Sequence, residues 1–178
     1  EKYLSYLHRE IREVSRRLGR RRKVVQYHWG GGTPTYLSVD EMRALQQVVT
    51  ECFDSQTDDE SAIEVDPRVT RREQIDLLRA MGFNRLSMGV QDFDPEVQAI
   101  INRHQTERQT RDLFAYTRTA GFGSITVDLI YALPLHQPQT CPTTLDAVSA
   151  PRPARVAAQP SAPLPRPRPP HHCVDPPT

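Results

Sequence analysis

Cysteine is scarce in this chain of 178 residues, which contains only Cys52, Cys141 and Cys173. Cysteines this few and this scattered do not form a disulfide framework, and they lack the short spacings typical of metal ligands. They fit a reducing compartment, so we expect a cytoplasmic protein. The sequence therefore predicts no metal site built from the chain's own side chains.

Long apolar runs and an excess of charge of one sign are missing as well. No stretch approaches the roughly 18 consecutive apolar residues of a membrane-spanning helix, and the formal net charge is only +1. These features argue against a membrane or a nucleic acid as a partner. One basic cluster, "RRLGRRRK" at residues 16–23, has the charge to hold phosphates. Without interleaved aromatic residues, it is more typical of a solvated helix end.

Proline, by contrast, is abundant, and most of the 16 prolines lie after residue 137. At this density, proline removes backbone hydrogen-bond donors and disfavours helices and central strands. The sequence therefore predicts two parts, residues 1–138 and a degenerate or disordered, Pro- and Arg-rich continuation over residues 139–178. Taken alone, residues 151–178 also leave open a proline-rich interaction protein, because they can form a polyproline II ligand.

Helix and strand patterns alternate along the first part. Apolar residues spaced three and four apart predict helices, and short β-branched runs predict the strands between them. Capping boxes at Ser38–Glu41 and Thr70–Glu73 predict two helix starts, and Asp94 before Pro95 predicts a third. In chain order we expect a helix at 1–18, a strand at 23–29, a helix from 38, a strand at 61–66, a helix from 70, a strand at 84–91, a short helix from 94, a helix at about 106–120 and a strand at 124–134.

This alternation predicts an α/β fold with parallel strands covered by helices. An internal repeat supports it, because "RAMGFNRLSMGV" and "RTAGFGSITVDL" both run from a helix end through Gly-Phe into a strand. Gly82 and Gly121 occupy matching places, where a left-handed residue ends a helix. Since the repeating unit keeps its length and register, part of a β/α barrel fits better than an open doubly wound sheet.

Polar residues follow the ends of the predicted strands. In parallel β/α folds the carboxyl ends of the strands gather at one face, and ligands bind there. That face would receive the residues at the four strand ends, and Arg103 follows the helix after the third strand. The strand-end residues are Gly30–Thr33, Glu64, Asp66, Gln91, Asp92 and Asp128. Together these residues predict a polar pocket for a ligand that carries a ribose, an amino acid or a carboxylate.

Each of these residues also has an ordinary explanation. The glycines can form a tight turn, Glu64 or Asp66 can cap a loop, and Gln91 can be a buried amide. Arg103 can be a surface cation. Asp128 is harder to explain in this way, because it interrupts the apolar run "ITVDLIYAL", where a carboxylate is costly unless it is paired. The pocket contains no Ser-His-Asp arrangement and no Walker A lysine after the glycines, so no catalytic residue is predicted.

Five stretches resemble a known family: "HWGGGTPTYL", "IEVDP", "GFNRLSMGVQDFDPEVQ", "INRHQ" and "VDLIYALP". Over about residues 1–138 the chain is similar to the oxygen-independent coproporphyrinogen III oxidases, which are radical S-adenosylmethionine (SAM) enzymes of haem biosynthesis. Related haem chaperones tend to have "GVQSF" and "LGRxH", where this chain has "GVQDF" and "NRHQ". These differences favour the oxidase over a chaperone fragment, which remains the alternative within the family.

The resemblance implies part of a TIM-like barrel that binds a [4Fe-4S] cluster and two SAM molecules. By motif match, Gly31 and Glu64 would contact the first SAM. The second SAM would be held by Gly32, Thr33, Gln91, Arg103 and Asp128. The implied reaction converts two propionates of coproporphyrinogen III to vinyl groups through SAM radical chemistry, giving protoporphyrinogen IX. An electron donor and a monomeric full-length enzyme are implied as well.

The chain departs from the family in two ways. The family's cluster is held by a CxxxCxxC loop that this sequence does not contain. The chain also begins "EKYLSYLHRE", without an initiator methionine or a leader, so we expect an inactive fragment that also lacks the family's C-terminal part. A non-catalytic SAM-binding module is the alternative from another class.

Beyond residue 138, "TLDAV", "RPARVAA" and "SAPLP" still resemble the family's next helix, strand and loop. Ala162 falls at a family SAM-contacting position but is left out of the predicted site.

Overall fold

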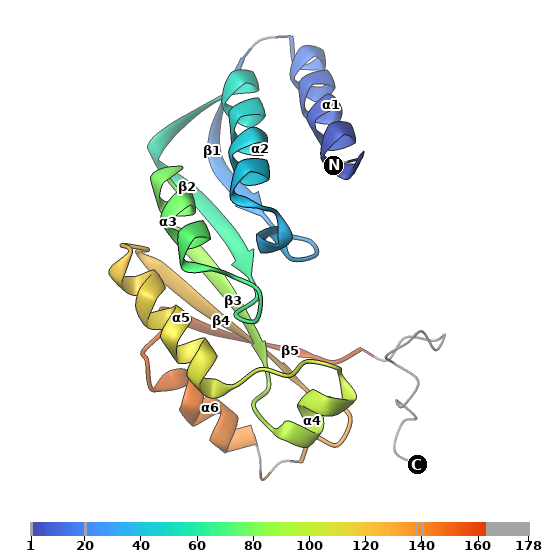
Figure 1. Ribbon diagram of the computed structural model, residues 1–178, viewed down its shortest axis with the longest axis vertical. Helices are drawn as coiled ribbons and strands as arrows, with labels where there is room; N and C mark the ends of the chain where they lie inside the picture. Colours follow the sequence, from blue (N-terminus) through green and yellow to red (C-terminus); the bar gives the residue numbers. More distant parts are fainter. Residues whose placement is uncertain (1, 20, 138, 140, 163–178) are drawn as a thin grey trace.

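The computed structural model describes residues 2–19, 21–137, 139 and 141–162, and it forms a five-stranded parallel sheet in the order β1-β2-β3-β4-β5 (Figure 1). Helices α2, α3, α5 and α6 follow one another along one face of the sheet. The elements are α1 (Lys2–Arg17), β1 (Arg22–Trp29), the 3-10 helix η1 (Pro34–Tyr36), α2 (Val39–Cys52), β2 (Phe53–Val65), α3 (Arg72–Ala80), β3 (Arg85–Gln91), α4 (Pro95–Ile100), α5 (Glu107–Thr119), β4 (Ser124–Tyr131), α6 (Cys141–Ser149) and β5 (Arg155–Pro160).

The strand order confirms the predicted α/β architecture. Each strand pairs in parallel with the next strand of the sequence, so every crossover moves the sheet in the same direction. A doubly wound sheet would reverse that direction at a switch point. The sheet therefore has the strand order of part of a β/α barrel.

The two faces of the sheet differ in character because side chains alternate along a strand. One set from β3 and β4 is buried and joins a single core with apolar side chains of α2, α3 and α5. The other set includes Ser87, Gly89 and Asp128, and each of these is partly exposed. The buried set from these two strands is Leu86, Met88, Val90, Ile125, Val127 and Leu129.

The internal repeat marks two equivalent helix ends. Gly82 and Gly121 have φ of 94° and 93°, as predicted for residues that end a helix in the left-handed conformation. The next residue is a buried phenylalanine in each case, and its backbone N–H donates back across the helix end: Phe83 to Leu78 O (3.0 Å) and Phe122 to Thr117 O (3.4 Å). The repeat is therefore a capping motif that anchors the start of β3 and of β4 in the core.

Most predicted helix starts are confirmed, but that of α3 is displaced. Ser38 and Glu41 form the predicted capping box, and Asp94 caps α4. The box predicted at Thr70–Glu73 is wrong, because α3 begins two residues later and the backbone N–H of Arg71 donates to the Gln74 side chain (2.8 Å). The Thr70 hydroxyl donates instead to the Asp66 carbonyl, at 2.7 Å.

The second strand is longer than predicted. β2 starts at Phe53, directly after α2, and its first residues pair with β1 before the register shifts between Val24 and Gln26. The polar stretch at 54–60 lacks the apolar alternation by which a strand is recognised in a sequence. The structure pairs the start of β2 with β1 from Arg22↔Phe53 to Val24↔Ser55, and the pairing resumes at Gln26↔Glu60.

Helix α6 and strand β5 lie after residue 138. β5 pairs with β4 from Thr126↔Arg155 to Tyr131↔Pro160, so the stretches that resemble a family helix and strand do form these elements. The division of the chain at residue 138 stays a prediction. The expected proline-rich tail from residue 163 onward lies outside the described residues.

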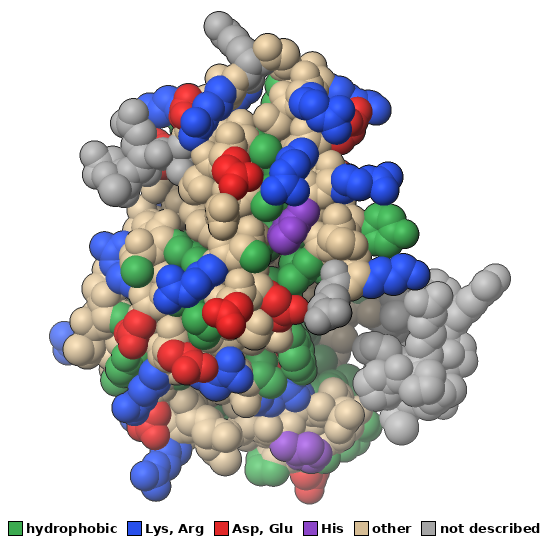
Figure 2. Space-filling view, turned by 45° about the horizontal axis from the view of Figure 1, so that its top comes forward, with side chains coloured by type: hydrophobic (Ala, Val, Ile, Leu, Met, Phe, Trp, Pro, Cys, Tyr) green, Lys and Arg blue, Asp and Glu red, His purple; other side chains and the backbone are tan. Residues whose placement is uncertain are grey.

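None of the helices in the described part of the chain combines the length and apolar character needed to cross a membrane. On the face shown in Figure 2, basic and acidic side chains are interspersed rather than segregated. This surface agrees with the net charge of +1.

Candidate functional site

All seven residues of the predicted site line one small cavity at the carboxyl ends of β1 to β4. Its volume is about 200 Å³, below the roughly 300–1,000 Å³ of a pocket that encloses a whole small ligand. The cavity therefore accommodates one polar end of a ligand. It is lined by Gly31, Gly32, Thr33, Glu64, Val65, Asp66, Gly89, Gln91, Arg103 and Asp128.

The glycine loop after β1 has separate reasons for its first two glycines. A Cβ at Gly30 would lie 2.5 Å from His28 Nε2 and 2.8 Å from Glu64 Oε1, so only glycine allows these side chains to come so close. Gly31 has a φ of 104°, which side chains rarely adopt. Gly32 has neither constraint, and no described atom lies within 4 Å of a Cβ built there. Close packing thus explains Gly30 and the turn explains Gly31, whereas Gly32 leaves bare backbone beside the cavity.

A β-bulge at the end of β3 directs Gln91 toward the site. The pairing of β3 with β4 shifts between Gly89 and Gln91, and Gln91 itself has a φ of 71°. Bulges re-aim a side chain in this way near binding sites. A Cβ on Gly89 would lie 3.1 Å from Gln91 Nε2 and 3.3 Å from Arg103 Nη2. Glycine at position 89 therefore makes room for both polar side chains.

Arg103 is largely buried rather than a surface cation. Its side chain is 16% exposed, and its Nη2 donates to the Gly89 carbonyl at 2.7 Å. The same nitrogen lies 3.3 Å from Asp66 Oδ2. Burial lowers the pKa of Arg103, and the charge of Asp66 opposes that effect. Its Nε is buried and has no hydrogen-bond partner among the described residues.

Asp66, directly after β2, also lines the cavity, although it is not among the seven residues of the predicted site. Its carboxylate is 5% exposed and is bound by the Arg68 side chain, with Nη2 to Oδ2 at 2.7 Å. Burial by itself raises the pKa of Asp66, but hydrogen bonds from Arg68 and the charge of Arg103 outweigh it, and the pKa is lowered. Its place two residues after Glu64, next to Pro67, was the only signal in the sequence.

Asp128 and Glu64 form the acidic side of the cavity. Burial raises the pKa of Asp128, a hydrogen bond from Ser87 lowers it, and the charge of Glu64 raises it further; the net shift is upward. The Ser87 hydroxyl donates to Asp128 Oδ2, so this partly buried carboxylate does have a partner. Glu64 Oε1 lies 3.2 Å from His28 Nε2. These carboxylates are acceptors for an ammonium group or for hydroxyls of a ligand.

The side chains present do not fit an iron–sulfur cluster. Such clusters are held by cysteine thiolates, and the sequence contains no CxxxCxxC stretch. Within the described residues, no three His, Cys, Asp or Glu side chains are placed to hold a metal ion. The cavity offers one cation, three carboxylates, an amide and glycine backbone. That set suits an organic ligand with a carboxylate and hydrogen-bond donors.

Comparisons with known proteins point to one family. A model of the radical SAM superfamily matches residues 1–148. The oxygen-independent coproporphyrinogen III oxidase of Salmonella typhimurium is 46% identical over 93% of this chain, and that of Pseudomonas aeruginosa is 45% identical over 92%. The chain spans 36% of the length of each of these relatives.

Solved structures agree with these matches. The coproporphyrinogen III oxidase of Escherichia coli, described as a radical SAM enzyme, superposes with a TM-score of 0.87 at 44% identity, over 92% of this chain and 38% of that one. The radical SAM methyltransferase TsrM of Kitasatospora setae, with cobalamin and a [4Fe-4S] cluster bound, superposes with a TM-score of 0.65 at 16% identity. This match covers 90% of this chain and 31% of that one. The second likeness concerns the fold alone.

Proposed function

We propose a function from the premise that this chain belongs to the radical SAM superfamily: it forms a SAM-binding part of an oxygen-independent coproporphyrinogen III oxidase. The identity of 46% to a named oxidase and the TM-score of 0.87 to a solved one support the proposal. One observation of the site carries it. Residues chosen at the ends of four separate strands line a single cavity.

The donor set fits the polar groups of SAM. Among the described residues that line the cavity, Arg103 is the one cation, and a guanidinium suits the carboxylate of the methionine part. Glu64 and Asp128 suit the ammonium group or the ribose hydroxyls, and Gly32 leaves room for backbone contacts. In the proposed assignment, Gly31 and Glu64 serve a first SAM. The residues of a second SAM are Gly32, Thr33, Gln91, Arg103 and Asp128.

When bound, SAM supplies the radical chemistry by which two propionates of coproporphyrinogen III become vinyl groups with loss of carbon dioxide. The described residues contribute binding and orientation: Arg103 fixes a carboxylate, and Ser87 keeps Asp128 in place as an acceptor. The chain supplies no cluster thiolates, and we propose that it is inactive alone. An electron donor, a monomeric full-length enzyme and a cytoplasmic location belong to the same proposal, with neither nucleic acid nor membrane as partner.

Calorimetric titration of the purified chain with SAM tests the proposal. We expect heat of binding with the unmodified chain, and a loss of about tenfold in affinity in Asp128→Asn and in Gln91→Ala, since each change removes a hydrogen bond to the ligand. Asp112→Asn is the matched control, because Asp112 is 63% exposed on α5. Absence of heat with the unmodified chain would refute SAM binding.

The missing cluster thiolates favour a second candidate, a non-catalytic module that binds SAM without cleaving it. Both candidates predict that this polypeptide binds SAM and takes up no iron and sulfide. They differ in the coding sequence: a CxxxCxxC loop encoded in frame before Glu1 would favour the oxidase.

A further inference from the structure

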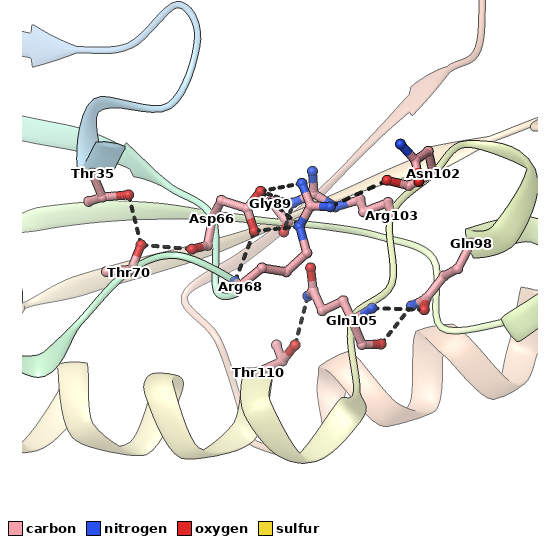
Figure 3. Close-up of polar contacts among 10 residues, drawn as sticks. All are labelled: Thr35, Asp66, Arg68, Thr70, Gly89, Gln98, Asn102, Arg103, Gln105 and Thr110. Carbon is pink, nitrogen blue, oxygen red and sulfur yellow. Dashed lines mark hydrogen bonds and ion pairs between the residues drawn. The ribbon is translucent and has the colours of Figure 1, made fainter. Parts of the chain in front are cut away.

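Asp66 connects three segments that border the cavity (Figure 3). Its carboxylate faces Arg68 and Arg103, and its backbone carbonyl accepts from the Thr70 hydroxyl at 2.7 Å. Thr70 Oγ1 lies 2.8 Å from Thr35 Oγ1, in η1 after the glycine loop. Asp66 is thus fixed relative to both the glycine loop and the end of β3.

The Asp66 carboxylate is shared by two guanidinium groups. Arg68 contributes Nη2 and Nε to Oδ2, at 2.7 and 3.1 Å, and its backbone N–H to Oδ1, at 2.9 Å. Arg103 Nη2 is the further partner of Oδ2, at 3.3 Å. Within this group of three side chains, the two guanidinium groups exceed the carboxylate by one positive charge, while Glu64 and Asp128 give other parts of the cavity lining a negative charge. An anionic ligand group is therefore expected beside Arg103 rather than beside those carboxylates.

The backbone of Arg103 is held independently of Asp66. Its N–H donates to the Gln98 carbonyl at 2.8 Å. The buried side chains of Gln98 and Gln105 fix the loop between α4 and α5, with Gln98 Nε2 donating to the Gln105 carbonyl at 2.8 Å. Loss of the Asp66 charge would therefore leave the loop in place and free only the long Arg103 side chain, which has many rotamers.

We propose that Asp66 is a positioning residue: it holds the Arg103 guanidinium against the Gly89 carbonyl, so that Arg103 recognises the carboxylate of the bound ligand. This inference rests on the proposed SAM binding and names the part of SAM that the Asp66–Arg103 pair selects. Asp66 acts through Arg103, whose Nε is buried and has no hydrogen-bond partner among the described residues.

The test compares two ligands on the purified chain. SAM carries the amino-acid carboxylate, and 5′-methylthioadenosine has the same nucleoside without it. In Asp66→Asn we expect the affinity for SAM to fall about tenfold and that for 5′-methylthioadenosine to stay unchanged. In an Arg103→Gln background, Asp66→Asn should cause no further loss, because the two residues act as one unit. An equal loss for both ligands would show a structural role and overturn the proposal.

Asp76→Asn is the matched control, because Asp76 on α3 is also a hydrogen-bonded carboxylate, bound by the Tyr116 hydroxyl at 2.7 Å. It should leave the ratio of the two affinities unchanged, and a changed ratio would count against the assignment.

A second measurement needs no ligand. The NMR signal of the Arg103 Nε–H, assigned with Arg103→Lys, should shift in Asp66→Asn and stay in place in Asp76→Asn. An unshifted signal in Asp66→Asn overturns the positioning role. A shifted signal in a chain that binds no SAM overturns the proposed function alone.

Discussion

At the scale of single residues, the pKa values of the two aspartates of the site shift in opposite directions, although burial raises both. Asp66 gains enough donors to lower its pKa, whereas Asp128 has one hydroxyl partner and a neighbouring Glu64, and its pKa is raised. A carboxylate with a raised pKa in a cavity is typical of functional sites. Asp66 therefore stabilises the fold, whereas the charged form of Asp128 costs stability that a bound donor would recover.

The dependence of folding stability on pH in the acid range should distinguish these two aspartates. The folded pKa of Asp66 is lowered, so its contribution is present above its unfolded pKa, near 3.9, and is lost as pH falls through the folded value. Asp66→Asn should cost about 3 kcal/mol at neutral pH, and this difference should shrink as the solution is acidified. The folded pKa of Asp128 is raised, so its cost is absent below the unfolded pKa and appears as pH rises through the folded value.

Urea unfolding measured between about pH 3 and pH 6 provides the check. Asp128→Asn should be at least as stable as the unmodified chain at the upper end, with the gain fading toward the lower end. The free energy of unfolding of Asp112→Asn should change with pH in the same way as that of the unmodified chain. Parallel curves for Asp66→Asn would contradict the assignment of its partners.

The sequence predicts the members of the site but not their mutual contacts. Strand ends identified Glu64, Gln91 and Asp128, because the location of ligands in parallel sheets is a general rule. The contact between Arg103 and Asp66 was not predicted from the sequence. It requires the turn at Asn102, with φ of 50°, and the Gly89 carbonyl at a bulge. Neither feature leaves a residue pattern in the sequence.

At the scale of elements, capping residues predicted most helix boundaries accurately, whereas the start of the polar strand β2 was not predicted. Ser38, Asp94 and the glycines at 82 and 121 act through local hydrogen bonds, which the sequence nearby determines. The start of β2 at Phe53, where the strand pairs with β1, was not predicted from the sequence. Thr70 was expected to cap α3, but its hydroxyl bonds to the Asp66 carbonyl instead.

The bulge in β3 can be tested by filling the space it leaves. Gly89→Ala places a Cβ 3.1 Å from Gln91 Nε2 and 3.3 Å from Arg103 Nη2, so both side chains must move by a few tenths of an ångström. We expect SAM affinity to fall several-fold and the free energy of unfolding to change by less than about 1 kcal/mol. Calorimetry and urea unfolding measure the two effects.

Gly123→Ala serves as the control for Gly89→Ala. The nearest described atom to its Cβ is the Asn84 carbonyl oxygen at 3.8 Å, which is an ordinary contact. If Gly89→Ala bound SAM as well as Gly123→Ala does, the bulge would not be a determinant of the site.

At the scale of the whole molecule, the sheet gathers a binding face without the thiolates of a cluster. The described elements bring together residues from four strand ends, and the sequence contains no CxxxCxxC stretch. We therefore propose that this chain binds SAM and does not hold an iron–sulfur cluster.

Reconstitution tests that division. After anaerobic incubation with iron and sulfide and removal of excess reagent, the purified chain should show no visible absorbance of an iron–sulfur cluster and no retained iron. A chain with all three cysteines changed to serine should behave identically. Retained iron that is lost in the serine variant would contradict the prediction, since cysteine thiolates are the ligands that clusters require.

The sequential strand order also has a consequence for how the chain assembles. Each strand of the described sheet pairs only with the strand before and after it in the sequence, so each pairing closes only the crossover between neighbours, of which the one from β3 to β4, with α4 and α5, is the longest. The entropy lost in closing a loop grows with its length, and long-range pairings slow folding. The sheet can therefore grow from β1 to β5 in the order in which a ribosome delivers the strands. The cavity requires the ends of β1 to β4, so it can form once β4 has joined the sheet and before β5 does.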